Sequence, residues 1–481
     1  MSVKKSIFYN VLLAISQVFF PLITFPYLAR TLGPEHVGAL NFAESMAKYF
    51  VMLAALGIPI YGVREIAKVN NDKPALTKLF TEIFAINLIC TIVLSVFFTT
   101  AIFLVPQLYD QKELFYWTVL YFMLQVFYLE WFFNGMNQFK FIAIRQFIIR
   151  FFFIVFVFLL IRTKVDYINY MMMQVGLNVL LAVINFNNLR KLITIDRHIL
   201  TNLNLRRHLK PLFYLFLTIF SISIYFSLDT ILLGFLANNE SVGYYSTALK
   251  LNKLIIAVFS AVTVAIFPSM ISLYHNGHVE RFKEMIRQVF FVLVSLSIPA
   301  ILVLVFCAKE IVHLLFSQSF DRAILPLQLT APLILIVSLS SIFGFQVLSA
   351  LSKDRQILYS ALIGMFVSIV LSVLLVPHYK EVGEAITILF TELSVCLAFI
   401  YFTIKNFKVG GLRKMFLKLF ISAIPYTLFI IIFKNIVNND VTRLLSVTIV
   451  SLVWFCIYHL FVLKESYFKT YLDDFIEKKS A

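Results

Sequence analysis

The sequence predicts an all-α integral membrane protein with about fourteen transmembrane helices. The chain has 481 residues, of which 61% are hydrophobic and only 14% are charged, and its mean hydropathy is +0.90. A helix that spans a bilayer needs about 20 mostly apolar residues, and such runs recur almost without pause. Basic residues gather in alternate connections between these runs. Together, these observations exclude a soluble domain and favour a polytopic membrane protein.

The first six apolar runs are expected to form an N-terminal lobe, residues 1–195. Lys4 and Lys5 precede the first run, which is too long for a signal peptide and is therefore interpreted as a span. Pro21 and Pro26 lie inside this run, and helix-breaking residues end it at Gly33-Pro34. Either these prolines form hinges around a cavity, or they are ordinary membrane-helix prolines. The expected spans are 8–29, 37–57, 79–105, 114–136, 141–161 and 167–189.

The next six runs are expected to form a second lobe, residues 196–405. Pro268 interrupts the eighth run and Pro299 the ninth. The last two runs have no counterparts, so residues 406–481 are expected to form two additional helices and a cytoplasmic tail. The expected spans are 212–237, 243–274, 288–307, 324–350, 357–377, 382–404, 415–433 and 444–463.

An internal repeat supports this division into lobes. Residues 35–48 read EHVGALNFAESMAK and residues 240–253 read ESVGYYSTALKLNK, so that Gly38 aligns with Gly243 and Lys48 with Lys253. An even number of spans per lobe returns the chain to the same side of the membrane. We therefore expect the two lobes to be related by a pseudo-twofold axis along the membrane normal.

The distribution of positive charge predicts the topology. If the N-terminus is inside, the inner connections carry most of the 41 Lys and Arg, including the cluster at 190–210. This asymmetry is the positive-inside rule and places both termini in the cytoplasm. The basic clusters are therefore interpreted as topology signals that can also contact anionic membrane lipids. The net charge of +16 is not interpreted as a nucleic-acid-binding surface.

Motifs for soluble catalysis are absent from the sequence. It contains no nucleophile elbow, P-loop or HExxH motif, and its four cysteines are isolated in apolar runs. We therefore expect no enzymatic activity, no cofactor and no metal site.

Charged residues within the expected spans are the main functional signal, because a charge at mid-bilayer is costly and usually faces a cavity or a partner. Glu44 and Lys48 are spaced for a pair on one helix face. Lys250 and Lys253 share another face and call for an anionic partner. Asp229 is either that partner or, with Glu44, a site for a coupling ion, H⁺ or Na⁺. The alternative is a set of salt bridges that lock the bundle.

Several aromatic residues are candidates for stacking on sugar rings, although packing and interfacial anchoring are their commoner roles. They are Tyr128, Trp131, Tyr225, Tyr244 and Tyr245.

Four stretches resemble bacterial polysaccharide flippases of the Wzx type, in the multidrug/oligosaccharidyl-lipid/polysaccharide exporter superfamily. They are TLGPEHVGALNFAES (31–45), GIPIYGVREIAK (57–68), EWFFNGMNQFKFIAIRQ (130–146) and LDTILLGFLANNESVGYYSTALKL (228–251). The resemblance implies two six-helix lobes that move undecaprenyl-diphosphate-linked oligosaccharides to the outer leaflet of the bacterial cytoplasmic membrane by alternating access.

The resemblance also implies a site and a pathway. Positively charged residues in a central cavity bind the substrate, and the matching candidates are Arg30, Lys48, Arg64, Lys250 and Lys253. The last two helices help to form a groove for the lipid tail. The product is used for capsule, O-antigen or exopolysaccharide assembly, with a polysaccharide polymerase and other assembly proteins as partners.

Two alternatives remain at this point. A multidrug exporter of the same superfamily needs a dominant acidic site for cationic drugs, whereas the expected central charge here is mainly basic. An integral-membrane polysaccharide polymerase or acyltransferase usually carries catalytic residues in a sizeable external loop, whereas the expected external loops are short.

Overall fold

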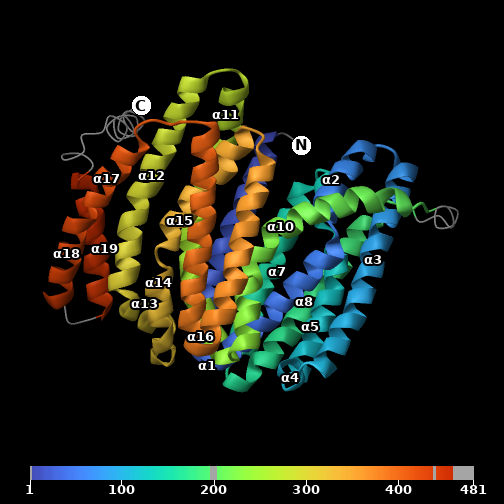
Figure 1. Cartoon of the computed structure of the whole chain (residues 1–481). Coiled ribbons are helices and arrows are strands. Elements are labelled where there is room, and N and C mark those ends of the chain that lie inside the picture. The colour runs from blue at the N-terminus through green and yellow to red at the C-terminus, as the bar shows by residue number, and fades with distance from the viewer. Residues whose placement is uncertain (1–2, 195–202, 437–439, 459–481) are drawn as a thin grey trace. The chain divides into compact units, whose positions relative to one another are not determined.

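The computed structural model describes the backbone of residues 3–194, 203–436 and 440–458, with most side chains outside 3–19, 218–227 and 433–441. Contacts divide the chain into a unit of Met1–Gly243 and a unit of Tyr244–Ala481. The described residues of both units form helices and connections, as the all-α prediction requires (Figure 1). This boundary does not test the expected lobe boundaries at 195 and 405, which stay predictions.

Among the described residues of the first unit, eleven helical segments precede the helix that crosses into the second unit. They are α1 (Val3–Ala55), α2 (Ile58–Val69), α3 (Lys73–Leu104), α4 (Pro106–Tyr109), α5 (Lys112–Leu124), η1 (Gln125–Tyr128), α6 (Glu130–Gly135), α7 (Phe139–Leu160), η2 (Lys164–Asp166), α8 (Tyr167–Leu189) and α10 (Arg206–Leu236). The neighbouring helix α11 (Asn239–His275) begins in the first unit and continues into the second.

The second unit continues with ten segments after α11. They are α12 (Val279–Phe306), α13 (Ala308–Leu315), η3 (Gln318–Ala323), α14 (Ile324–Thr330), α15 (Leu333–Ser340), η4 (Ser341–Leu348), α16 (Asp354–Asn406), α17 (Leu412–Ile421), α18 (Ala423–Ile436) and α19 (Asp440–Ile457). The fourteenth expected span, 444–463, and the basic tail after it lie partly or wholly outside the described residues.

Among the described residues, seven helices are long and apolar enough to cross a membrane, or nine if each bent pair is one span. The fourteen expected runs outnumber these helices partly because two expected pairs are each assigned to a single 53-residue helix. Helix α1 changes direction at Gly33, where φ is +76°. Helix α16 does so at Lys380, where φ is +48°. Spans one and two therefore fall in α1, and spans eleven and twelve in α16.

The fourth expected span is not the continuous helix that its apolar run predicts. Helix α5 gives way to the 3₁₀ segment η1, and Leu129 adopts a left-handed conformation with φ of +49° before α6 begins at Glu130. A non-glycine residue rarely takes this conformation without support from its surroundings. This break positions the site described below.

Aromatic packing fixes the helices around the break. Trp131 on α6 stacks on Phe80 of α3, with ring centroids 5.8 Å apart and planes 15° from parallel. On α2, a Cβ added to Gly62 would stand 2.4 Å from Cε3 of Trp131, so only glycine allows this approach. Phe132 and Ile66 extend the same buried cluster. Helices α2, α3 and α6 therefore form one rigid corner of the first unit.

The repeat is visible as a reciprocal backbone contact. A Cβ on Gly38 would stand 1.6 Å from the carbonyl oxygen of Asn239, and a Cβ on Gly243 would stand 1.9 Å from that of Pro34. Pro34 aligns with Asn239 in the repeat, just as Gly38 aligns with Gly243. Each repeat segment thus contacts its counterpart through equivalent positions, as a twofold axis between the two segments requires.

Candidate functional site

The predicted cationic residues of the first unit lie on two helices. Arg30 and Lys48 have exposed side chains on α1, on either side of the bend at Gly33. Arg64 is exposed on α2, where its Nε donates to Glu65 at 3.0 Å and its guanidinium lies 5.5 Å from the ring centroid of Tyr61. Adjacent residues on a helix point in different directions, but the long Arg64 side chain still reaches Glu65.

Helix α11 carries the other two predicted cationic residues. Lys253 is exposed and Lys250 is partly buried. Lys250 and Arg30 both take part in further interactions. Because three of the five candidates belong to the first unit and two to the second, a shared central cavity stays a prediction.

The two predicted coupling acids differ in their surroundings. Asp229 on α10 is 2% exposed, and its Oδ1 accepts from the backbone nitrogen of Thr230 at 2.7 Å. Glu44 on α1 accepts from Nε2 of Gln174 at 2.8 Å and from the hydroxyl of Tyr170 at 3.4 Å. The Glu44 carboxylate is therefore hydrogen-bonded to residues of α8, whereas Lys48, its expected ion-pair partner, is exposed.

A chain of amides connects Glu44 to the break in the fourth span. After Gln174 donates to Glu44, Asn178 donates through Nδ2 to the backbone carbonyl of Gln174 at 2.8 Å. Gln125, on η1, in turn donates through Nε2 to Oδ1 of Asn178 at 3.2 Å. Buried polar groups in a membrane protein require such partners, and here the partners follow one another across α1, α8 and η1.

Two residues from neighbouring helices satisfy the carbonyls that the break releases. Asn185 on α8 donates through Nδ2 to the carbonyls of Phe127 at 2.7 Å and Tyr128 at 2.9 Å. Arg145 on α7 donates to Oδ1 of Asn185 at 2.5 Å, and its guanidinium lies 5.3 Å from the ring centroid of Tyr128. At 2% exposure, Arg145 is a buried residue that supports the structure of the break.

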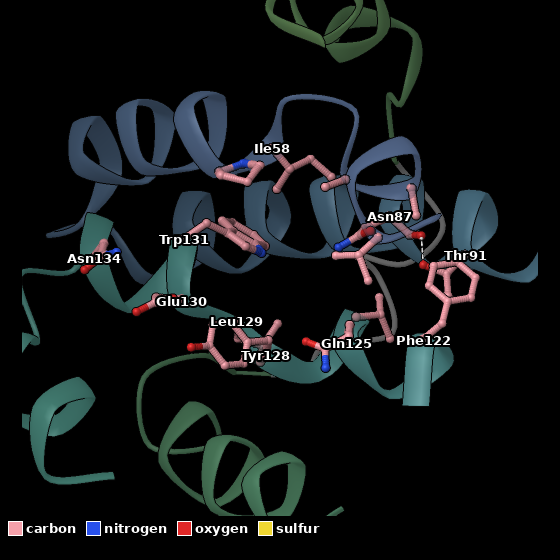
Figure 2. Close-up of a pocket in the computed structure, with 15 residues that line it drawn as sticks. Ile58, Asn87, Thr91, Phe122, Gln125, Tyr128, Leu129, Glu130, Trp131 and Asn134 are labelled. Carbon is pink, nitrogen blue, oxygen red and sulfur yellow. Dashed lines mark hydrogen bonds between the residues drawn. The ribbon is translucent and has the colours of Figure 1, made fainter. Parts of the chain in front are cut away.

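A cavity of about 270 Å³ opens at this break, between the end of α1, the start of α2, and α3, η1 and α6. Figure 2 shows its lining residues, with Trp131 reaching into the space from α6 and Gln125 facing it from η1. Thr91 donates to the backbone carbonyl of Asn87 at 2.8 Å. The polar side chains around the cavity are Asn87, Thr91, Gln125, Tyr128, Glu130, Trp131 and Asn134.

The predicted stacking role of Trp131 does not fit its geometry. Phe80 stacks on the ring and Gly62 packs against its benzo edge, so a sugar could reach only the pyrrole edge. The side chain of Tyr225 lies outside the described residues. Tyr245 is fully buried, and Tyr244 is 5% exposed, which is the packing role expected for most of these aromatics.

The cluster at 190–210 was interpreted as a topology signal that can also contact anionic lipids, but part of it makes a specific buried contact. Glu82 on α3 has no exposed surface; it accepts from the backbone nitrogen of Asn204 at 2.8 Å and from Arg207. His208 lies 3.0 Å from the same carboxylate, and its other ring nitrogen lies 2.6 Å from the hydroxyl of Tyr61. These contacts attach the start of α10 to α2 and α3.

In the second unit, an apolar cavity of about 530 Å³ lies between α11, α12 and α19. Val262 and Ile266 line it from α11, Phe291 and Leu296 from α12, and Phe455 from α19. Gln288 and Ser295 are the polar side chains at its wall. A groove for a lipid tail was expected to include the last helices, and α19 contributes to the wall of this cavity.

The described helices, seven to nine of which are long and apolar enough to cross a membrane, define an all-helical membrane fold. The fold matches the solved structure of the lipid II flippase MurJ in an inward closed conformation, with a TM-score of 0.73 and 15% identity over 95% of this chain and 100% of that one. It also matches an inward-facing multidrug resistance MATE family transporter, with a TM-score of 0.62 and 13% identity over 83% of this chain and 96% of that one.

The chain belongs to the polysaccharide biosynthesis protein family, whose model matches residues 3–274; a MatE model matches residues 215–377. It is 26% identical to a putative O-antigen transporter of Escherichia coli K12 over 84% of this chain and 98% of the relative. A putative O-antigen transporter of Shigella dysenteriae is 22% identical over 82% of this chain and 98% of the relative. The family resemblance stated from the sequence is confirmed.

Proposed function

We propose that this protein is a flippase for lipid-linked oligosaccharides. The single observation that carries the proposal is the alignment with the putative O-antigen transporter of E. coli over 98% of that relative's length. The match to the MurJ fold agrees with it. In this proposal, both termini lie in the cytoplasm, and the protein moves undecaprenyl-diphosphate-linked units from the inner to the outer leaflet of a bacterial cytoplasmic membrane.

The substrate's diphosphate is bound by the five cationic candidates. Arg can hold a phosphate through two parallel hydrogen bonds, whereas Lys acts as a point charge. Arg30, Lys48, Arg64 and Lys253 are exposed, so a ligand can reach their side chains. Outward movement of roughly two negative charges across an inside-negative membrane of 100 mV gains about 4–5 kcal/mol, so the membrane potential favours export.

The isoprenoid tail occupies the apolar cavity between α11, α12 and α19. Its lining is almost wholly hydrophobic and includes Phe455 of the last helix. Because the lining is apolar, the tail can move from the lipid into this cavity without exposing its hydrocarbon to water. The head of the substrate can then move through a polar interior while the tail stays in an apolar one.

Asp229 and Glu44 bind the coupling ion, H⁺ or Na⁺. Both lie within expected spans, and both already accept hydrogen bonds from neutral groups. A carboxylate within the membrane-spanning part of the chain is a common binding site for such a cation. Inward movement of that cation would drive export or return the empty carrier to its starting conformation. The exported oligosaccharide would then be the substrate of the assembly enzymes outside.

Complementation tests the proposal. The gene is expressed in a bacterial strain that lacks its own O-antigen flippase and carries the glycosyltransferases for the matching repeat unit. Restored surface polysaccharide, with an unchanged susceptibility to cationic drugs, is the expected result. Normal expression without surface polysaccharide, together with new drug resistance, would instead establish the multidrug exporter that the MatE match favours.

A further inference from the structure

We propose that the cavity at the break in the fourth span binds one neutral sugar ring of the transported oligosaccharide. This inference rests on the proposed function and deepens it, because it assigns the sugar and the diphosphate to different places. The groups that carry it are Trp131, Gln125, Asn87, Asn134 and Glu130, all within the first unit.

The first observation is a buried donor with no acceptor. Trp131 is 7% exposed, and its Nε1 has no hydrogen-bond partner in the described structure. The ring cannot turn to find one, because Phe80 stacks on it and Gly62 packs against its opposite edge. A buried donor left unpaired costs about 1–3 kcal/mol. Since the indole nitrogen can only donate, the cavity needs an occupant with an acceptor.

The second observation is a set of amides prepared for hydrogen bonding. Gln125 is held through Nε2 by Asn178, an arrangement that presents its Oε1 as an acceptor. Within the described residues, the side-chain amides of Asn87 and Asn134 make no hydrogen bond, and each brings both a donor and an acceptor to the cavity. The carboxylate of Glu130 adds a further acceptor. The occupant must therefore donate as well as accept.

Charge and size narrow the choice of ligand. The cavity has no Lys or Arg in its lining, and its one carboxylate side chain is Glu130, so the lining offers no positively charged partner to a diphosphate. The indole N–H of Trp131 disfavours a simple cation, because a cation offers no acceptor to this donor. Pockets for drug-sized ligands measure roughly 300–1,000 Å³, so about 270 Å³ suits a single ring better than a whole repeat unit. A hydroxylated ring supplies donors and acceptors together in that volume.

Calorimetry on the purified full-length protein tests the inference. The probes are free glucose, galactose, mannose and N-acetylglucosamine, with glucuronate as the charged control. We expect at least one neutral sugar to bind with a dissociation constant on the order of 1 mM, typical of a small polar ligand, and glucuronate to bind more weakly because of Glu130. Heats that match dilution for every neutral sugar would overturn the inference and leave water as the occupant.

Variants separate the sugar site from the diphosphate site. Trp131→Phe keeps an aromatic ring against Phe80 but removes the N–H, and Gln125→Ala removes an acceptor; each should weaken sugar binding at least tenfold. Trp117→Phe, the same exchange on α5 outside the cavity lining, is the matched control and should bind as the wild type does. Equal affinity in Trp131→Phe and Trp117→Phe would place the bound sugar elsewhere.

The two proposals can fail separately. A wild-type protein that complements the flippase-deficient strain but binds no neutral sugar contradicts only the sugar site. A protein that binds a sugar in the Trp131-dependent manner but never restores surface polysaccharide contradicts only the flippase. Lys253→Ala should abolish export while leaving the sugar affinity unchanged, because Lys253 does not line this cavity.

Discussion

Gly38 and Gly243 occupy equivalent positions in the repeat, and each packs against the backbone of the other's segment. The backbone nitrogen of Gly243 would lie 2.6 Å from a Cβ added to Gly38. Neither position has room for a side chain, since the neighbouring atoms belong to the main chain and cannot rotate away. The beginning of α11 is therefore held against α1 by two glycines that the repeat makes equivalent.

Gly38→Ala and Gly243→Ala should each lower the stability of the purified protein by about 1–3 kcal/mol, the usual cost of overpacking. The thermal unfolding midpoint measures this effect. Gly176→Ala on α8 is the control, because a Cβ there would meet nothing within 4 Å. Midpoints that agree among all three variants would show that the two segments separate readily.

Glu82→Gln should weaken the attachment of α10 to α2 and α3. The carboxylate has no exposed surface and accepts from Asn204, Arg207 and His208, so loss of its charge should cost about 1–3 kcal/mol. Unfolding in detergent measures the change. The exposed Glu280, paired with Lys283 at 2.7 Å, supplies the control: Glu280→Gln should leave the midpoint unchanged. An equally stable Glu82→Gln variant would contradict this role.

Lys48→Ala and Lys253→Ala should together abolish surface polysaccharide in the complementation strain without lowering protein level. Lys253→Arg should keep partial function, because the charge survives while its geometry changes. The exposed Lys353 in the second unit is the control, and Lys353→Ala should export normally. Full activity of the double variant would rule out these lysines as the diphosphate site.

Asp229→Asn should reduce transport while largely preserving substrate binding, if Asp229 binds the driving cation. Export is scored in cells, and binding of a lipid-linked oligosaccharide is measured on the purified protein. Asn keeps the acceptor for Thr230 but removes the charge. A parallel loss of binding would show that Asp229 positions a lysine and does not bind the ion.

Cysteine labelling checks the topology. In a variant without its own four cysteines, a cysteine at Asn238 should react with an impermeant reagent added outside, because Asn238 is exposed in the connection between α10 and α11. A cysteine at His198, which lies outside the described residues, should react only after the membrane is opened. The opposite pattern would invert the assigned orientation.

The sequence predicted the helical class and the positions of most helices, because apolar length is a local property of the chain. It also predicted the bend at Gly33, where glycine and proline stand together. It could not predict the break at Leu129, an apolar residue within an apolar run. That conformation depends on Asn185, which lies 58 residues from the Phe127 carbonyl that it satisfies.

The candidate site was predicted less completely for the same reason. Charge alone drew attention to Glu44, Lys48 and Asp229, whereas the amides Gln125 and Asn178 gave no comparable signal. Polar residues inside apolar runs were the available clue, since each needs a partner in the membrane. Which partner it finds depends on the packing of distant helices. The pairing of Glu44 with Gln174 instead of Lys48 illustrates this limit.

The fixed ring of Trp131 also limits how the protein can diversify. Gly62 and Phe80 both contact Trp131, so substitutions at Trp131 and at either neighbour should be strongly non-additive, and a change at Trp131 is tolerated only with a change at a neighbour. Asn87 and Asn134 have no such constraint from hydrogen bonding in the described structure. Adaptation to a new polysaccharide would therefore proceed by single substitutions at Asn87 or Asn134, whereas Gly62, Phe80 and Trp131 would be retained together.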